Sequence, residues 1–189
     1  CAARGARLEA DPRLRECGLG EFEGKTKDEV YGPGYAALWA RLGSLGHEVR
    51  VRTPYFAGLE APLGVGARAA EALVDAALGA GLAPGGGPAT VLAVTHSTVI
   101  ESLLAGLFGA DFESVETKNL AWVRLRLGRG GCRSAWRLEL DGSDGVEWRP
   151  SPDAVVLDPS PATAALGAGA LGLVPVRTAA AEAGAAAPS

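Results

Sequence analysis

A single histidine lies where a short apolar segment gives way to a helical pattern. Residues 90–95 (TVLAVT) are almost fully apolar, which is typical of a strand buried on both faces of a parallel sheet. His96 follows at once, and Ser97 opens a segment with helical spacing. In α/β sheets ligands bind beyond the carboxyl ends of the strands, and the N–H groups of a helix N-terminus suit an anion such as phosphate. An imidazole at this point could hold a phosphoryl oxygen or act as a nucleophile.

A second candidate is the carboxyl group of Glu16, which lies in the glycine-containing segment Arg13–Gly24. Glycines allow the backbone of such a loop to approach a ligand closely. A partly buried glutamate with a raised pKa could donate a proton to a leaving oxygen. Each residue also has a plainer interpretation, because a lone histidine can be satisfied by a backbone carbonyl and a loop glutamate is usually solvated.

Several local patterns predict the elements that position these residues. Thr26 and Glu29 have the spacing of a capping box at the start of a short helix. Val65, Ala69 and Leu73 mark one face of a longer helix, because residues three to four apart lie on the same side.

The segment after His96 carries signals for both ends of a helix. Ser97 or Thr98 can cap its start, and Glu101 lies three residues after Thr98, which is the spacing of a second capping box. Gly109 follows the last apolar residues of the pattern and predicts the end of the helix.

The C-terminal half contains a hairpin pattern and a biased tail. Residues 123–127 and 136–140 each alternate apolar and polar side chains, and glycine-rich residues 128–131 join them, so we expect a β-hairpin. Beyond about Asp158 the chain is rich in Ala, Gly and Pro. We therefore expect a partial α/β domain over 1–157 and a disordered tail over 158–189.

Composition narrows the classes of function. The 189 residues have a net charge of −4 and a pI near 5.3, which argues against a nucleic-acid-binding protein. Two histidines and three scattered cysteines lack the spacing of a zinc site, so no metal is expected. No apolar run is long and unbroken enough for a membrane helix, so no membrane partner is expected. The odd number of cysteines favours a reducing compartment, cytoplasmic or organellar.

Several blocks of residues, in their order and spacing, match the pattern of one family. The first block consists of Arg13, Leu14, Glu16, Gly20, Glu23, Gly24, Thr26 and Glu29. Glu60 and Arg68 follow, eight residues apart, as in the family's "G-E-S…R" pattern, although Gly-Glu-Ser itself is not preserved. The next block is VLAVTHSTVIESLLAGLFG at 91–109, and an Asn-initiated strand at 119–123 follows it. Over about residues 8–140 the chain resembles the histidine phosphatase superfamily, in particular its phosphoglycerate mutase-like branch.

The resemblance implies a fold and a set of roles. The fold would be a three-layer α/β sandwich, with helices flanking a mostly parallel central sheet. His96 would be the second histidine, hydrogen-bonded to the transferred phosphoryl group, and Glu16 would be the proton donor to the leaving group. The backbone N–H of Ser97 would help to bind phosphate. Lys27 falls where the mutases place a lysine that contacts the substrate carboxylate. Leu19 stands where mutases typically carry a tyrosine, which favours a phosphatase over a mutase.

The family's nucleophile is not found in these residues. It is the histidine of an Arg-His-Gly motif on the first strand, and no such motif occurs here, since His47 has no arginine before it. The sequence also starts with Cys1 and contains no methionine. We therefore expect a domain that lacks its first strand, with little or no turnover from these residues alone. The usual glycine after the second histidine is Ser97 here.

The expected function of the full-length protein is phosphomonoester hydrolysis through a phosphohistidine, on a small phosphorylated substrate and without a metal or other cofactor. Two alternatives remain open at this point. One is mutase-type phosphoryl transfer, and the other is a non-catalytic module that binds a phospho-ligand or a protein.

Overall fold

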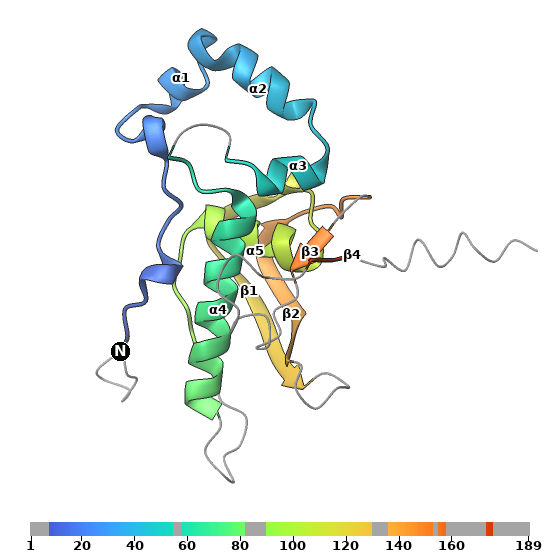
Figure 1. Cartoon of the computed structure of the whole chain (residues 1–189). Helices are drawn as coiled ribbons and strands as arrows, with labels where there is room; N and C mark the ends of the chain where they lie inside the picture. Colours follow the sequence, from blue (N-terminus) through green and yellow to red (C-terminus); the bar gives the residue numbers. More distant parts are fainter. Residues whose placement is uncertain are drawn as a thin grey trace, which may run out of the picture.

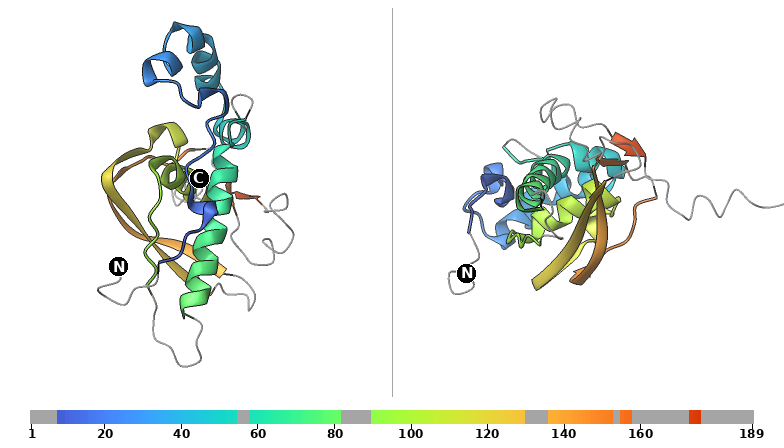
Figure 2. Two further views of the ribbon diagram at one scale, coloured as in Figure 1. Left: turned by 90° about the vertical axis from the view of Figure 1, so that its left-hand side faces the viewer. Right: turned by 90° about the horizontal axis from the view of Figure 1, so that it is seen from below.

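Two long helices and a β-hairpin form the main body of the chain. α4 (Pro62–Gly81) packs along α5 (Ser97–Phe108). α5 lies between α4 and the hairpin, which consists of β1 (Glu116–Arg129) and β2 (Trp136–Glu147) (Figure 1, Figure 2). α4, α5 and the hairpin thus form three successive layers, and the site described below lies at the N-terminal end of α5.

The remaining elements are short. They are α1 (Lys27–Val30), α2 (Ala36–Gly43), α3 (His47–Arg52), β3 (Val155–Leu157) and β4 (Leu173–Pro175). α1 and α2 project from one end of the body, while α3 contacts α4 (Figure 1). None of the described helices combines the length and the apolar character that crossing a bilayer requires. The computed structural model describes residues 8–54, 58–81, 90–129, 136–152, 155–157 and 173–175. The expected tail, 158–189, lies outside the described residues except for β4, which pairs antiparallel with β3.

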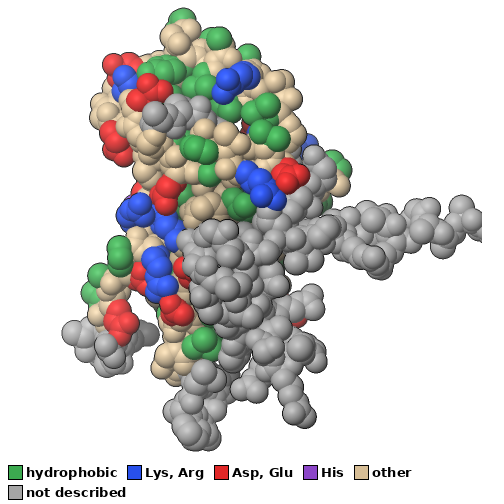
Figure 3. Space-filling model, in the orientation of Figure 1, with side chains coloured by type: hydrophobic (Ala, Val, Ile, Leu, Met, Phe, Trp, Pro, Cys, Tyr) green, Lys and Arg blue, Asp and Glu red, His purple; other side chains and the backbone are tan. Residues whose placement is uncertain are grey.

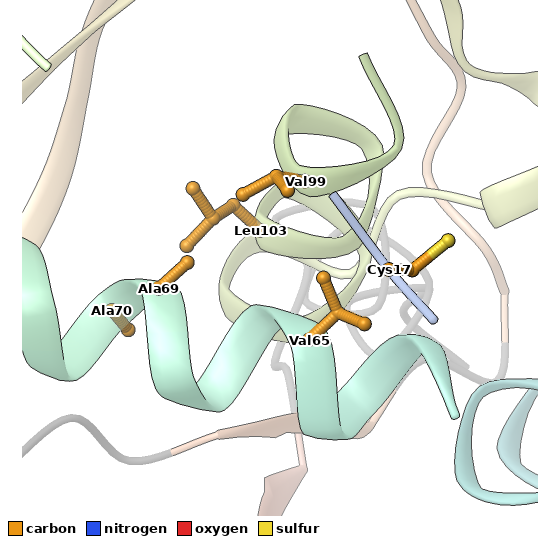
Figure 4. Close-up of a cluster of buried hydrophobic side chains, with 6 residues drawn as sticks. All are labelled: Cys17, Val65, Ala69, Ala70, Val99 and Leu103. Atoms are coloured by element: carbon orange, nitrogen blue, oxygen red, sulfur yellow. The ribbon is translucent and has the colours of Figure 1, made fainter. Parts of the chain in front are cut away.

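The core between α4 and α5 is built from small apolar side chains. Val65 and Ala69 of α4 meet Val99 and Leu103 of α5, and Cys17 from the N-terminal loop completes the cluster (Figure 4). Val65 and Ala69 are fully buried, which confirms the predicted apolar face of α4, and Val99 of α5 is fully buried against them. Small side chains at this contact let the two helices approach closely.

At Gly66 the backbone of α4 lies close to the backbone of α5. A Cβ atom at Gly66 would lie 2.6 Å from the backbone carbonyl oxygen of Ser102. Because a helix backbone cannot yield as a flexible side chain can, we expect Gly66→Ala to lower the free energy of unfolding by roughly 1–3 kcal/mol. Urea denaturation measures this change. Gly64→Ala, on the same helix with nothing within 4 Å of the added carbon, is the control and is expected to keep or raise stability. Equal stabilities of the two variants would contradict the close packing.

Three helix ends were predicted from local sequence signals, and two of them form as predicted. The Thr26–Glu29 capping box is confirmed, since the Thr26 side chain accepts from the N–H of Glu29 and the Glu29 side chain accepts from the N–H of Thr26. Gly109 ends α5 with φ 69°, in the left-handed region that favours glycine. The second capping box is wrong. His96 is the N-cap of α5 and makes no side-chain cap bond, so Thr98 lies inside the first turn, where it cannot serve as an N-cap.

The predicted hairpin is confirmed. β1 and β2 pair antiparallel, with Leu127 opposite Leu138 and Trp122 opposite Asp144. Leu104 of α5, together with Ala110 and Val115, forms a second buried cluster against the inner face of the hairpin. The hairpin therefore covers the side of α5 that faces away from α4.

The predicted strand at 90–95 is not formed. These residues make no β-ladder with another described residue, and the side chains of Leu92 and Val94 are 87% and 83% exposed. A strand exists only through a hydrogen-bonded partner, and an apolar sequence does not supply one. Likewise, the described strands pair only antiparallel, so the expected parallel central sheet is not seen among them.

Candidate active site

The structure brings together the two residues that the sequence singled out. Nδ1 of His96 lies 3.6 Å from Oε2 of Glu16. This distance is beyond a direct hydrogen bond, but the two groups attract whenever the imidazole is protonated. Both side chains remain accessible to a ligand, since His96 is 55% exposed and Glu16 is 37% exposed. The pair is therefore open to solvent on one side and held by protein on the other.

The two oxygens of Glu16 have different surroundings. Oε1 accepts a hydrogen bond of 2.9 Å from the backbone N–H of Cys17, whereas Oε2 is the oxygen nearest His96. The Cys17 thiol is buried in the core beside this loop, and burial raises its pKa to about 11. Cys17 is therefore a packing residue here, because a thiol with such a pKa holds very little thiolate at neutral pH.

Ser97 is the first helical residue of α5 and lies directly after His96. The first N–H groups of a helix have no carbonyl partner within it, and they carry the positive end of the helix dipole. The backbone N–H of Ser97 is therefore a donor for an anion next to the His96 ring. The phosphate-binding role that the family resemblance implies for this N–H stays a prediction.

Lys27 occupies a different part of the molecule. It begins α1, in the projection of α1 and α2 (Figure 1), and none of the contacts among described residues joins it to His96 or Glu16. The structure therefore does not bring Lys27 to the pair, and its suggested contact with a substrate carboxylate stays a prediction.

Arg68 of α4 is the main anchor of the loop that carries Glu16. Its Nε and Nη2 donate to the carboxylate of Glu60 at 2.8 and 2.9 Å. Its remaining hydrogens go to the backbone carbonyls of Arg13, Arg15 and Glu16. With a side chain only 14% exposed, Arg68 thus uses both its charge and its planar fork of donors. The sequence showed the spacing of Glu60 and Arg68, but not this role.

Glu60 extends the same anchor to the other end of the loop. It accepts a hydrogen bond from the N–H of Gly18, and its own N–H donates to the carbonyl of Gly18. The bonds from Arg68 hold the pKa of Glu60 below its usual value, with smaller help from the Gly18 N–H. Glu60 is therefore ionised at neutral pH and neutralises Arg68 within the protein.

Thr95, the residue before His96, makes the second connection to the loop. Its hydroxyl donates to the backbone carbonyl of Leu14 at 2.7 Å. Thr95 was not among the residues predicted for the site, although its position directly before His96 could have indicated it. The bond joins the two segments that carry His96 and Glu16.

Charged side chains of both signs occur on the described surface. On the face shown in Figure 3, acidic and basic side chains of the described residues are interspersed and do not gather into one patch. Arg13, for example, is held by Asp11 at 2.8 Å and Asp75 at 2.7 Å. Among the described residues, no cluster of three or more His, Cys, Asp or Glu side chains could hold a metal ion. Attraction for an anion would therefore come from the N-terminus of α5 and from His96 itself.

Glu101 is a second carboxyl group near the pair, one turn along α5. Burial raises its pKa above the usual value of 4.5, and the negative charge of Glu16 adds to this. Because the folded state holds the proton more tightly than the unfolded state, stability is greatest when Glu101 is protonated. It falls as the pH rises through the folded pKa.

We therefore expect Glu101→Gln, which removes the charge and keeps the shape, to raise the midpoint of thermal unfolding at pH 7. The gain should disappear below about pH 4, where glutamates are protonated in both states. Melting curves between pH 4 and pH 8 measure this. Glu21→Gln, which changes an exposed glutamate, serves as the control. A Glu101→Gln variant that is less stable than the wild type at pH 7 would contradict the expected cost of this buried charge.

Comparison with known proteins gives one match. The sequence model described as "Histidine phosphatase superfamily (branch 1)" matches residues 1–138, which is well over half of the chain. No curated protein and no solved structure matches the chain. The matched range includes the Glu16 loop, the Glu60–Arg68 pair and His96 at the start of α5. The chain therefore belongs to the histidine phosphatase superfamily.

Proposed function

We propose that the native protein hydrolyses small phosphomonoesters through a phosphohistidine intermediate, with His96 and Glu16 in its active site. Membership of the superfamily supports phosphatase-type or mutase-type phosphoryl transfer in general. The observation that carries the finer proposal is the pairing of His96 Nδ1 with Glu16 Oε2 at 3.6 Å, at the N-terminus of α5.

His96 and Ser97 supply the binding site for the phosphoryl group. The imidazole of His96 and the N–H groups at the start of α5 are hydrogen-bond donors from adjacent residues, and the helix dipole adds a partial positive charge at this end. Such donors stabilise the charge that spreads over the equatorial oxygens in the transition state of phosphoryl transfer. His96 is therefore a phosphate-binding residue in this proposal and not the nucleophile.

Glu16 supplies the proton for the leaving group. Because Oε1 already accepts from the N–H of Cys17, the proton of a neutral carboxyl belongs on Oε2, the oxygen nearest His96. In the first step a neutral histidine attacks phosphorus, the P–O bond to the leaving group breaks, and the leaving oxygen takes the proton of Glu16. In the second step Glu16 accepts a proton from water, which attacks the phosphohistidine and releases inorganic phosphate.

The attacking histidine comes from a strand beside residues 90–95 in this proposal. The exposed Leu92 and Val94 lie on a segment without a described strand partner. A parallel strand added there would bury these side chains and would place its carboxyl end next to His96. In this proposal that strand carries the Arg-His-Gly motif that the family resemblance implies, and it would complete a three-layer sandwich with a mostly parallel sheet.

Hydrolysis is favoured over mutase activity by the residue at position 19. Leu19 is partly exposed and forms an isolated β-bridge with Leu59. Its side chain has no hydroxyl group, whereas the mutases typically carry a tyrosine at this position. Lys27, the suggested contact for a substrate carboxylate, lies in the projection of α1 and α2. A phosphate ester with an ordinary alcohol as leaving group therefore fits the described residues better than a phosphoglycerate.

The test uses the native protein and a panel of phosphomonoesters. We expect release of inorganic phosphate and, after rapid quenching at alkaline pH, a phosphohistidine detectable by mass spectrometry. His96→Ala is expected to lower the rate by about 10²–10³-fold, the cost of losing one donor to the transition state. His47→Ala, which changes the other histidine of the chain, is expected to retain activity.

Three outcomes would overturn the proposal. Isomeric phosphate esters without free phosphate would show a mutase. Binding of the esters without turnover or phosphoenzyme would show a binding module. Phosphate release that His96→Ala leaves unchanged would show that the chemistry takes place elsewhere.

A further inference from the structure

We propose that Thr95 is a positioning residue that fixes the carboxyl of Glu16 beside His96, with Arg68 holding the same loop from the opposite side. This inference rests on the proposed function, because it gives Glu16 the role of proton donor. It goes beyond the hydrogen bond itself and gives Thr95 a role in the proton transfer from Glu16.

The loop around Glu16 begins in the 3₁₀ turn Pro12–Leu14, and side chains from distant parts of the chain hold it to the rest of the protein. Four successive backbone carbonyls, those of residues 13–16, each accept a hydrogen bond from a side chain. Arg68 donates to three of them and Thr95 donates to the carbonyl of Leu14. Backbone carbonyls are strong acceptors, and here two distant side chains supply the donors. The position of the loop is therefore set by where Arg68 and Thr95 stand.

The two anchors have different effects. Arg68 belongs to α4, so its bonds fix the loop relative to the helix core. Thr95 is adjacent to His96, and Leu14 is two residues before Glu16. The Thr95–Leu14 hydrogen bond therefore links the backbone next to His96 to the backbone near Glu16. Few rotatable bonds separate the two candidate catalytic side chains along this path. Among the hydrogen bonds described for residues 90–96, this is the one that joins the histidine segment to the loop of Glu16.

Loss of this connection has a predictable chemical signature. Displacement of a catalytic group by about 1 Å can cost on the order of 10²-fold in rate. If the displaced group is the proton donor, the cost falls on substrates whose leaving group needs a proton. An alkyl phosphate expels a strongly basic alkoxide, whereas 4-nitrophenyl phosphate expels a stabilised phenolate that needs little protonation. Damage to phosphate binding or to the fold would slow both substrates alike.

The experiment compares Thr95→Val with Thr95→Ser in the native protein. Valine keeps the shape and removes the hydroxyl, and serine keeps the hydroxyl. We expect Thr95→Val to lower kcat for an alkyl phosphate by about 10–100-fold, with little change in KM and little change for 4-nitrophenyl phosphate. Thr95→Ser is expected to retain most of the rate. In a Glu16→Gln background Thr95→Val is expected to cause no further loss, because both changes act on the same proton transfer.

A second measurement separates this inference from the proposed function. Amide hydrogen exchange of residues 13–18 is expected to be faster in Thr95→Val than in the wild type and in Thr95→Ser. If the native protein hydrolyses neither substrate, the proposed function fails, and faster exchange still supports the anchoring of the loop. Equal losses for both substrates, equal losses for valine and serine, or unchanged exchange would each overturn the positioning role of Thr95.

Discussion

Glu16→Gln in the native protein is expected to lower kcat for alkyl phosphomonoesters by about 10²–10⁴-fold, with little change in KM. Glutamine has nearly the same shape, and its carbonyl oxygen can still accept the hydrogen bond that Glu16 Oε1 takes from the N–H of Cys17. It has no acidic proton to give to the leaving oxygen. The change therefore removes the chemistry of the side chain and leaves the loop in place. Steady-state kinetics with alkyl and aryl substrates measure the effect.

The size of the loss should depend on the leaving group. We expect a much smaller loss with 4-nitrophenyl phosphate, because its leaving oxygen is stabilised without a proton. Glu21→Gln, five residues further along the same part of the chain and exposed, is the matched control and should leave both rates unchanged. A uniform loss across leaving groups would assign Glu16 to substrate binding instead of proton transfer.

The second large effect is expected from Arg68→Met, which should lower the free energy of unfolding by about 3 kcal/mol. Methionine fills similar space but donates no hydrogen bonds. The carboxylate of Glu60 would lose both bonds from the fork, and the carbonyls of Arg13, Arg15 and Glu16 would lose their donor. Removing the main partner of a partly buried charge costs more free energy than the pair contributed. Chemical denaturation at pH 7 measures the change.

The pH dependence identifies the cause of this loss. The pKa of Glu60 is lowered in the folded protein, chiefly by the bonds from Arg68. Its contribution is therefore present above the ordinary pKa near 4.5 and is lost as the pH falls through the folded pKa. We expect the difference between wild type and Arg68→Met to narrow below about pH 4. Arg68→Lys, which keeps the charge without the fork, should fall between the two. A loss that does not change with pH would point to packing alone.

Much of the local structure was predictable because a few neighbouring residues determine it. The capping box of Thr26 and Glu29, the buried face of α4 and the end of α5 at Gly109 all formed as their spacing predicted. The hairpin likewise followed from alternating side chains. His96 and Glu16 were found because their sequence blocks have a fixed order, and the structure places their side chains together.

Other features were decided by the tertiary structure. The apolar residues 90–95 satisfied every local requirement of a strand, yet no described residue pairs with them. α5 begins at Ser97 and not after Thr98, so the expected second capping box is not formed. Pairing and helix starts of this kind depend on which backbone groups meet in space, and local spacing does not contain that information.

The sequence by itself determined the family, the two candidate catalytic side chains and the elements that carry them. The tertiary structure decided how those side chains are held. Arg68 reaches three carbonyls more than fifty residues away in the chain, and Thr95 reaches Leu14 across 81 residues. Such bonds require a donor and an acceptor to meet within about 3 Å, which only the packing of α4 against α5 and the N-terminal loop brings about.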